Sequence, residues 1–388
     1  MPANINAEEA VWEGNGVKVG AIEAQLQRLW NSPDGAWSGE GRRPDIRTSV
    51  LNLVIYARDD DVARQLSDDI DKLAGGHPSR TIMLSPGRPH GEDLVDAHVA
   101  ITTRGAYAEY KQVCAEQIVL KVHGQAAHHI DSVVLPLLAP DLPVFVWWPG
   151  ETPFRQHAFV QLRDAANRFI VDSQDFARDE MELVEMAQAV RLAQDHCAFT
   201  DFNWSRLAPW REAIAAFFNP PESRPHLDTL THVQLECDPE HGGLSKPQAL
   251  LLAGWLAARL GWRPTDRSLQ SNKLRFNTTG PKHAVSLELV FHEAGAKGRD
   301  VPLAKLNGPD ATFALHRDRR RGPVSATSHV NGQQVMSRRV DIAEPDTVQL
   351  LFGELETFHH IVRFEEALDR AAALLDPSHQ RARRSFVE

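Results

Sequence analysis

Residues 49–84 read SVLNLVIYARDDDVARQLSDDIDKLAGGHPSRTIML, and this stretch decides the fold class. It opens with a near-continuous apolar run, 49–57, which has the length and composition of a buried strand. Two acidic residues then cap an amphipathic helical pattern, 60–74, which stops at a Gly-Gly pair. Because residues 81–84 return to an apolar strand pattern, the stretch predicts a β-α-β unit.

The alternation of strands and helices extends through the first half of the chain. Strand patterns occur at 97–102, 117–123, 144–148 and 169–171, and helical patterns at 17–30, 126–135, 179–194 and 204–218. Such alternation is typical of a mainly parallel sheet covered by helices. We therefore expect an α/β, Rossmann-like N-terminal domain at 1–225, ending in the Pro-rich linker 219–226.

The second half has a different pattern, with most of its strands in series. Strand patterns at 232–236, 274–277, 284–292, 312–316 and 335–340 lie between helical patterns at 247–260 and 350–375. Strands in a run with helices at either end indicate an α+β domain with a mainly antiparallel sheet. We expect this domain at 226–388.

Composition and charge exclude several classes of protein. The 388 residues carry a formal net charge of −10, which disfavours general binding to nucleic acid or to an anionic membrane. The most apolar stretch, 133–149, is interrupted by three prolines and is no spanning helix. The first ten residues have no signal-peptide pattern, and three widely spaced cysteines fit a reducing compartment. We expect a soluble, cytoplasmic protein whose cysteines are buried small hydrophobes.

Short catalytic and cofactor motifs are missing. The sequence has no G-x-G-x-x-G, no G-x-x-x-x-G-K-[ST], no G-x-S-x-G and no H-E-x-x-H. The histidine pairs 128–129 and 359–360 cannot chelate one metal alone, because adjacent helical side chains do not face each other. We predict no catalytic residue, no cofactor and no bound metal.

Two segments of the first half are candidates for binding. The loop GHPSR, 76–80, offers His77, Ser79 and Arg80 to a phosphate or a partner carboxylate, or forms only a turn with a local ion pair. At the end of the strand 144–148, Trp147 and Trp148 point to opposite faces, so they cannot both enter one core. Both interpretations, core packing and interface, stay open for this pair.

A third candidate is the helical segment 201–212, DFNWSRLAPWRE. Its tryptophans and arginines are typical of a protein interface and equally of packing between domains. The members singled out are Asn203, Trp204, Arg206, Trp210 and Arg211. Basic clusters at 316–321 and 381–384 contrast with the acidic background and are interpreted as solvated tips or as contacts to an acidic partner.

Six segments together resemble the OpcA family of glucose-6-phosphate dehydrogenase assembly proteins. They are HPSR (77–80), the Cys-x-Glu-x-Ile step (114–118), PLLAPDLPVFVWWPG (136–150), VDS (171–173), FNWSRLAPWRE (202–212) and LLAGWLAARLGW (251–262). The resemblance implies a non-catalytic partner that helps assemble and allosterically activates glucose-6-phosphate dehydrogenase. In photosynthetic members it implies a link to thioredoxin, but the wide cysteine spacing here argues against direct redox control.

A rival hypothesis is an enzyme acting on a sugar phosphate or nucleotide, with residues 76–80 as its phosphate loop. The missing catalytic constellation argues against it. If the protein is an activator, we expect activation to depend on Trp148, Trp204, Arg206 and Arg211 more than on the basic cluster 317–321. Desolvated aromatic and arginine anchors contribute more to binding than exposed ion pairs do.

Overall fold

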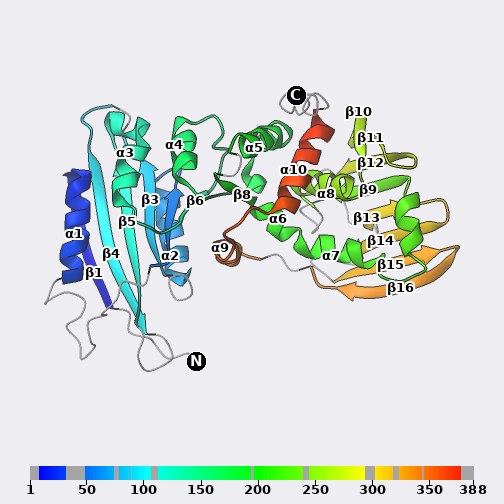
Figure 1. Ribbon diagram of the computed structural model, residues 1–388, viewed down its shortest axis with the longest axis horizontal. Coiled ribbons are helices and arrows are strands. Elements are labelled where there is room, and N and C mark those ends of the chain that lie inside the picture. The colour runs from blue at the N-terminus through cyan, green and yellow to red at the C-terminus, as the bar shows by residue number, and fades with distance from the viewer. Residues whose placement is uncertain are drawn as a thin grey trace. The chain divides into compact units, whose positions relative to one another are not determined.

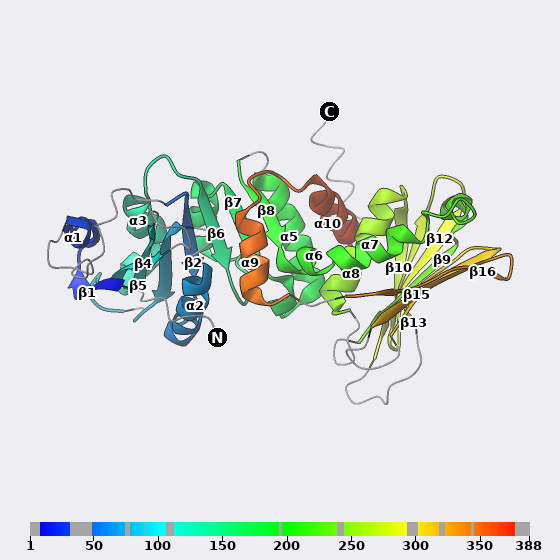
Figure 2. The same ribbon diagram turned by 90° about the horizontal axis from the view of Figure 1, so that it is seen from below.

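The computed structural model describes residues 8–31, 49–73, 78–88, 90–105, 112–193, 196–238, 244–292, 302–317, 323–342 and 345–376. The chain forms two compact units, each containing an eight-stranded sheet, shown in Figures 1 and 2. The first unit comprises Met1–Asp175, Leu192–Thr200 and Asp346–His360, and the second Phe176–Arg191, Asp201–Pro345 and Ile361–Glu388. Both units therefore draw on separate parts of the sequence.

Sheet A has the order β1-β4-β5-β3-β2-β6-β7-β8. Its strands are β1 (Glu8–Val17), β2 (Leu51–Tyr56), β3 (Ser79–Pro86), β4 (Val95–Gly105), β5 (Gln112–Val122), β6 (Val144–Trp148), β7 (Arg168–Val171) and β8 (Ala198–Asp201). Strands β5, β3, β2, β6 and β7 pair in parallel, whereas β1 and β4 form an antiparallel edge. The predicted α/β class with a mainly parallel sheet is confirmed.

Helices of the first unit cover this sheet. They are α1 (Val19–Asn31), α2 (Asp60–Leu73), α3 (Ile130–Val134), α4 (His157–Ala165) and α9 (Thr347–Leu355), with short 3₁₀ turns η1 (Gly124–His128), η2 (Leu135–Leu137) and η3 (Ser173–Asp175). Strand β2 is buried along nearly its whole length, because a parallel strand in the middle of the sheet packs on both faces. The β-α-β unit predicted from residues 49–84 is β2-α2-β3.

Sheet B of the second unit has the order β10-β11-β12-β9-β13-β14-β15-β16. Its strands are β9 (His232–Cys237), β10 (Arg263–Gln270), β11 (Lys273–Thr279), β12 (Ala284–Phe291), β13 (Pro302–Asn307), β14 (Ala311–Arg317), β15 (Val324–Val330) and β16 (Gln333–Val340). All its described pairs are antiparallel except β12 with β9. The predicted α+β class is therefore also confirmed.

The remaining helices are α5 (Asp179–Ala193), α6 (Phe202–Arg206), α7 (Ala208–Ala216), η4 (Arg224–Thr229), α8 (Lys246–Arg259) and α10 (Val362–Leu375). Helix α8 begins with a full capping box, in which Ser245 and Gln248 bond each other's backbone N–H groups. Its interior is buried almost throughout, as its all-apolar sequence predicts.

Three of the predicted helices are interrupted in the structure, so the prediction of a single continuous helix is wrong for each. The pattern at 204–218 divides into α6 and α7, because Pro209 has no N–H for an interior helix bond and instead occupies the first turn of α7. The pattern at 350–375 divides into α9 and α10, which belong to different units. The pattern at 126–135 is a 3₁₀ turn followed by the five-residue α3.

Five strands have no counterpart in the sequence patterns: β1, β8, β10, β13 and β15. Strand β10 is exposed or half-buried at every position, so it has no apolar alternation to recognise. It is a strand because β11 pairs with it along its length. An edge strand of this kind forms through hydrogen bonds to its neighbouring strand, and these bonds leave no periodic pattern in the sequence.

The predicted domain boundary at 225/226 falls inside the second compact unit. The two compact units interleave along the chain, whereas the predicted domains 1–225 and 226–388 are contiguous. The contiguous boundary stays a prediction about which part of the chain folds on its own.

Candidate functional site

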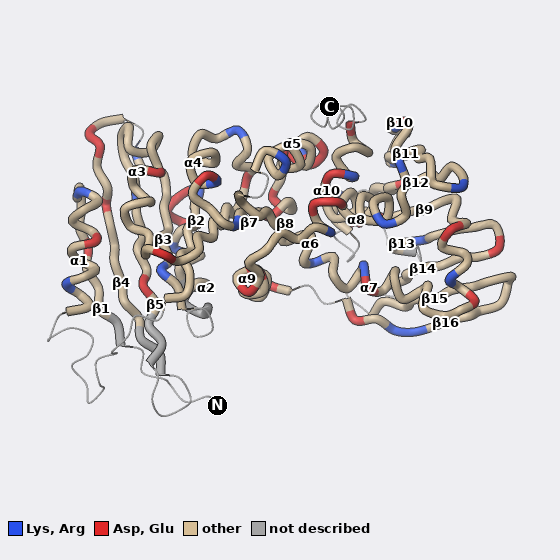
Figure 3. Tube along the Cα trace, in the orientation of Figure 1, with Lys and Arg blue, Asp and Glu red and all other residues tan. Residues whose placement is uncertain are grey.

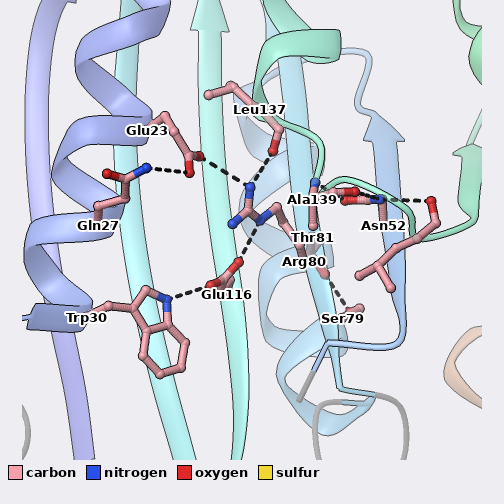
Figure 4. Close-up of polar contacts among 11 residues, drawn as sticks. Glu23, Gln27, Trp30, Asn52, Ser79, Arg80, Thr81, Glu116, Leu137 and Ala139 are labelled. Carbon is pink, nitrogen blue, oxygen red and sulfur yellow. Dashed lines mark hydrogen bonds and ion pairs between the residues drawn. The ribbon is translucent and has the colours of Figure 1, made fainter. Parts of the chain in front are cut away.

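The start of β3 contains Arg80, which lies at the centre of a buried polar network shown in Figure 4. Nε of Arg80 donates to Oε2 of Glu116 on the neighbouring strand β5, at 2.6 Å. Its Nη1 donates to the Leu137 carbonyl at 2.8 Å and lies 3.3 Å from a Glu23 carboxylate oxygen. The Trp30 indole donates to the other Glu116 oxygen. The guanidinium, only 3% exposed, thereby joins β3, β5, α1 and η2.

This network decides how Arg80 and Ser79 act. The Ser79 hydroxyl is buried and contacts the Thr81 hydroxyl at 3.1 Å. Neither side chain lies at an open surface where a phosphate or a partner carboxylate has direct access. Within the predicted loop 76–80, His77 lies outside the described residues. The local ion pair proposed for Arg80 instead reaches across the sheet to Glu116.

Trp147 and Trp148 are both buried, on opposite faces of β6. The ring of Trp148 stacks on Tyr56 from β2, with centroids 4.0 Å apart and planes inclined by 13°. On the same face it approaches Phe169 of β7 at 6.3 Å. These contacts support the interpretation of Trp148 as a core residue. Trp148 also lines a cavity.

That cavity lies where the parallel strands β2, β3 and β6 end at their carboxyl edge. Its volume is about 190 Å³, and its lining consists of Tyr56, Arg58, Pro86, Trp148, Pro149, Glu151 and Gln156. From β2 the chain continues to β3 on one side of the sheet, and β6 lies on the other side. The cavity is thus at the topological switch point, where open α/β sheets bind their ligands.

The first turn of α2, beside this cavity, is acidic. Asp59 caps the helix, accepting a hydrogen bond from the Val62 N–H at 2.9 Å, and this bond holds the pKa of Asp59 below its usual range. Asp60 accepts from the Ser85 hydroxyl at 2.7 Å and pairs with Lys121, and the Lys121 bond lowers its pKa. The Asp59 carboxylate thus takes a backbone N–H at the helix start, where dinucleotide sites bind a phosphate.

The second candidate cluster is the turn between α6 and α7. The guanidinium of Arg211 lies 3.6 Å from the centroid of the Trp204 ring, and its Nη1 donates to the Trp204 carbonyl at 2.6 Å. Burial lowers the pKa of Arg211 to about 10, so the group is still charged at neutral pH. Arg206 donates to the Asn203 side chain at 3.0 Å. Asp201 caps α6 through the Asn203 N–H.

Burial separates the members of this cluster. Asn203, Trp204 and Trp210 are buried, and Trp204 packs against Phe364 of α10 with centroids 5.8 Å apart. Arg206 and Arg211 are half-buried and keep part of their surface open. Because the helix breaks at Pro209, Arg206 and Trp210 do not form the i, i+4 pair of a single helix.

Other types of site receive no support in the described part of the chain. No group of three or more His, Cys, Asp or Glu side chains there is arranged to hold a metal ion. None of the described helices combines the length and apolarity needed to cross a bilayer. Figure 3 shows acidic and basic residues interspersed along both units rather than segregated by sign.

Two family models match consecutive parts of the chain. Residues 70–188 match a glucose-6-phosphate dehydrogenase subunit N-terminal domain, and residues 197–368 match the corresponding C-terminal domain. The chain belongs to the OpcA family. The matched regions include Arg80 and Glu116, the strand β6 and the turn between α6 and α7, so all three candidate segments lie in the part shared with the family.

Relatives in cyanobacteria carry the OpcA name. The OxPP cycle protein OpcA of Synechocystis is 28% identical over 79% of this chain and 66% of its own length. That of Synechococcus elongatus is 36% identical over 50% of this chain and 42% of its own length. The chain thus spans less than two thirds of these OpcA proteins. An oxidoreductase from Bacillus cereus superposes with a TM-score of 0.49 at 11% identity, covering 84% of this chain and 96% of that one.

Sequence reasoning missed Tyr56, Glu116 and Glu151. The sequence presents Tyr56 only as part of a buried strand, and Glu116 only as part of the Cys-x-Glu-x-Ile step. The available signal for the Arg80–Glu116 pair is a charged residue directly before the apolar run of each strand, at 81–84 and 117–123. Nothing local to Glu151 marks it as lining a cavity.

Proposed function

We propose that this protein is a non-catalytic, cytoplasmic assembly factor and allosteric activator of glucose-6-phosphate dehydrogenase, with no nucleic-acid partner. The observation that carries the proposal is the match of both subunit domains over residues 70–188 and 197–368. The family descriptions name glucose-6-phosphate dehydrogenase, which is the proposed partner enzyme. An activator of that enzyme needs a surface that binds it and needs no catalytic residues of its own.

The carboxyl edge of sheet A supports a non-catalytic role. In a dinucleotide-binding sheet this edge holds a glycine-rich turn and the pyrophosphate at a helix start. Here the turn 57–59 has no glycine, Tyr56 and Trp148 stack across the strand ends, and α2 begins with carboxylates. All three features oppose NADP, so we expect neither NADP binding nor glucose-6-phosphate oxidation by this protein alone.

The candidate interface is the partly open arginine pair Arg206 and Arg211, held in place by the buried Asn203, Trp204 and Trp210. An activator needs to favour the active state of its partner by about 1–3 kcal/mol, which changes affinity roughly 5- to 150-fold. A guanidinium fixed over an indole is a preorganised donor, and such anchors contribute strongly once desolvated. His77, Ser79, Arg80, Trp147 and Trp148 remain candidates from the sequence, and the last four of them are buried.

The deciding experiment titrates the protein into its cognate glucose-6-phosphate dehydrogenase while complex mass and NADP reduction are followed. We expect a complex of defined mass, with the rate rising to saturation at the same stoichiometry. No complex at micromolar concentrations would refute the proposal. Glucose-6-phosphate-dependent NADP reduction by the isolated protein, or stoichiometric NADP binding by calorimetry, would favour the rival hypothesis of an enzyme.

The interface is tested by Arg206→Ala and Arg211→Ala against neutralisation of the basic cluster 317–321. Most of that cluster lies outside the described residues, so the comparison is made on the measured activation of the dehydrogenase. With folding confirmed by thermal melts, we expect the two arginine variants to lose more activation than the neutralised cluster, at both low and high salt. The reverse order, with a strong salt dependence, would mean that contact is chiefly electrostatic.

A further inference from the structure

The cavity at the carboxyl edge of sheet A has an aromatic wall. Tyr56 stacks on Trp148, which in turn approaches Phe169, so three rings support one another behind this wall. Tyr56 is half-buried, and burial raises the pKa of its hydroxyl. Pro86 and Pro149 add rigid apolar walls. A preformed aromatic surface of this kind suits a planar or cationic group.

The size of the cavity limits what can enter. At about 190 Å³ it is smaller than the roughly 300–1,000 Å³ of pockets that enclose a small-molecule ligand. A dinucleotide does not fit. The volume is of the order of a single large side chain, so a side chain of a partner protein fits where a dinucleotide cofactor does not.

The charges around the cavity select the sign of that occupant. Arg58 is already paired with Asp59 at 3.1 Å, Asp60 with Lys121, and Asp61 with Arg64. Among the residues that the structure describes, Glu151 has no hydrogen-bond or ion-pair partner, and it lines the cavity. One uncompensated carboxylate beside an aromatic face is complementary to a cation.

We propose that this cavity binds an arginine side chain of a partner protein, stacked on Tyr56 and paired with Glu151. Arginine fits better than lysine, because a planar guanidinium stacks on a ring while donating in its plane to a carboxylate. The same chain places a guanidinium over an aromatic ring at Arg211, which lies 3.6 Å from the Trp204 ring centroid and donates to a backbone carbonyl. The identification of the partner as glucose-6-phosphate dehydrogenase rests on the proposed function, whereas the cavity chemistry does not.

The first experiment uses the isolated full-length protein. N-acetyl-arginine amide is titrated in, and the indole N–H resonances are followed by NMR, with the Trp148 signal assigned from a Trp148→Phe variant. We expect a saturable shift of the Trp148 resonance that Glu151→Gln weakens at least about fivefold. N-acetyl-leucine amide and N-acetyl-lysine amide should bind more weakly. An equal or stronger shift with the leucine probe would overturn the cationic occupant.

The second experiment measures the dissociation constant of the complex with the dehydrogenase. Glu151→Gln should weaken the wild-type complex about fivefold or more and Glu151→Lys at least tenfold, whereas Glu222→Gln, an exposed control outside the cavity, should change it less than twofold. If the wild-type protein binds and all three variants bind equally, the arginine site is refuted and the proposed function stands. If the wild-type protein forms no complex, the proposed function fails, and the NMR titration still decides the site.

Discussion

At the scale of single residues, the Arg80–Glu116 pair is a buried ionic contact inside the first unit. Both side chains are almost fully buried, and the pair is completed by the Leu137 carbonyl and the Trp30 indole. Such a pair is costly to desolvate, so it holds together only with every member present. Arg80 thereby acts as a structural residue that orders β3 and β5.

Removing one member of this pair should destabilise the fold strongly. We expect Arg80→Met to lower the free energy of unfolding by about 3–5 kcal/mol, since it leaves the Glu116 carboxylate buried without its counter-charge. The double variant Arg80→Met, Glu116→Leu should recover much of that loss. Urea denaturation measures both, with Arg64→Ala in the exposed pair with Asp61 as control. A folded Arg80→Met of unchanged stability would show that the network is not structural.

The cysteines give a second prediction at this scale. Cys197 and Cys237 are buried free thiols; burial raises the pKa of Cys197 to about 12 and also raises that of Cys237. Because the thiolate is the reactive form and a raised pKa suppresses it at pH 8, both should be inert in the native protein.

The measurement uses a thiol-reactive chromogenic disulfide at pH 8 and a Cys114→Ser variant, since Cys114 lies at a position whose side chain is outside the described residues. We expect no fast-reacting thiol in the native variant and two after denaturation. Rapid labelling of either buried cysteine before unfolding would show that its environment opens.

At the scale of elements, helices α8 and α10 approach closely at Gly254. A Cβ at this position would lie 2.8 Å from the Ala371 Cβ and collide with the Ala367 backbone carbonyl. Small residues on both helices allow this approach, so the glycine is required by packing rather than by backbone conformation. Gly353, in α9, has no such neighbour.

The two glycines form a matched test. Gly254→Ala should cost about 2 kcal/mol or more, because overpacking forces the helices apart. Gly353→Ala should be neutral or stabilising by about 0.5–1 kcal/mol, because alanine has the higher helix propensity. Thermal melts of the two variants give the comparison. Equal effects would mean that α8 and α10 adjust without cost.

At the scale of the whole molecule, the first unit includes a segment from near the end of the sequence. Arg168 of β7, fully buried, pairs with Glu354 of α9 at 2.7 Å and donates to the His359 carbonyl at 3.1 Å. Phe358 packs edge-on against Phe145 with centroids 5.3 Å apart. Residues 346–360 therefore complete the unit that β6 and β7 begin.

This interleaving predicts that residues 1–225 alone are an incomplete unit. Expressed by itself, the fragment should unfold at a lower temperature than the full chain, because Arg168 loses its carboxylate partner. A synthetic peptide of residues 346–360 should raise that temperature by mass action, and the same peptide with Glu354→Leu should not. A fragment that melts cooperatively and ignores the peptide would support the contiguous boundary at 225/226.

The sequence by itself determined the class of both sheets and the family. Apolar runs, caps and Gly or Pro stops are local signals, and they located β2, α2, β6 and α8 because neighbouring residues set those elements. The motif segments placed the chain among OpcA proteins without any knowledge of packing. The fold class and the family depend on the order of residues along the chain, and the sequence gives that order directly.

Only the tertiary structure decided how the chemically distinctive residues are used. Arg80 lies 36 residues from Glu116, and Arg168 lies 186 residues from Glu354, so neither pairing has a local signature. The cavity walled by Tyr56 and Trp148 exists because three parallel strands end together at the switch point. Burial, pairing and cavity shape arise from contacts between segments distant in sequence, and such contacts are fixed only when the sheets and helices pack.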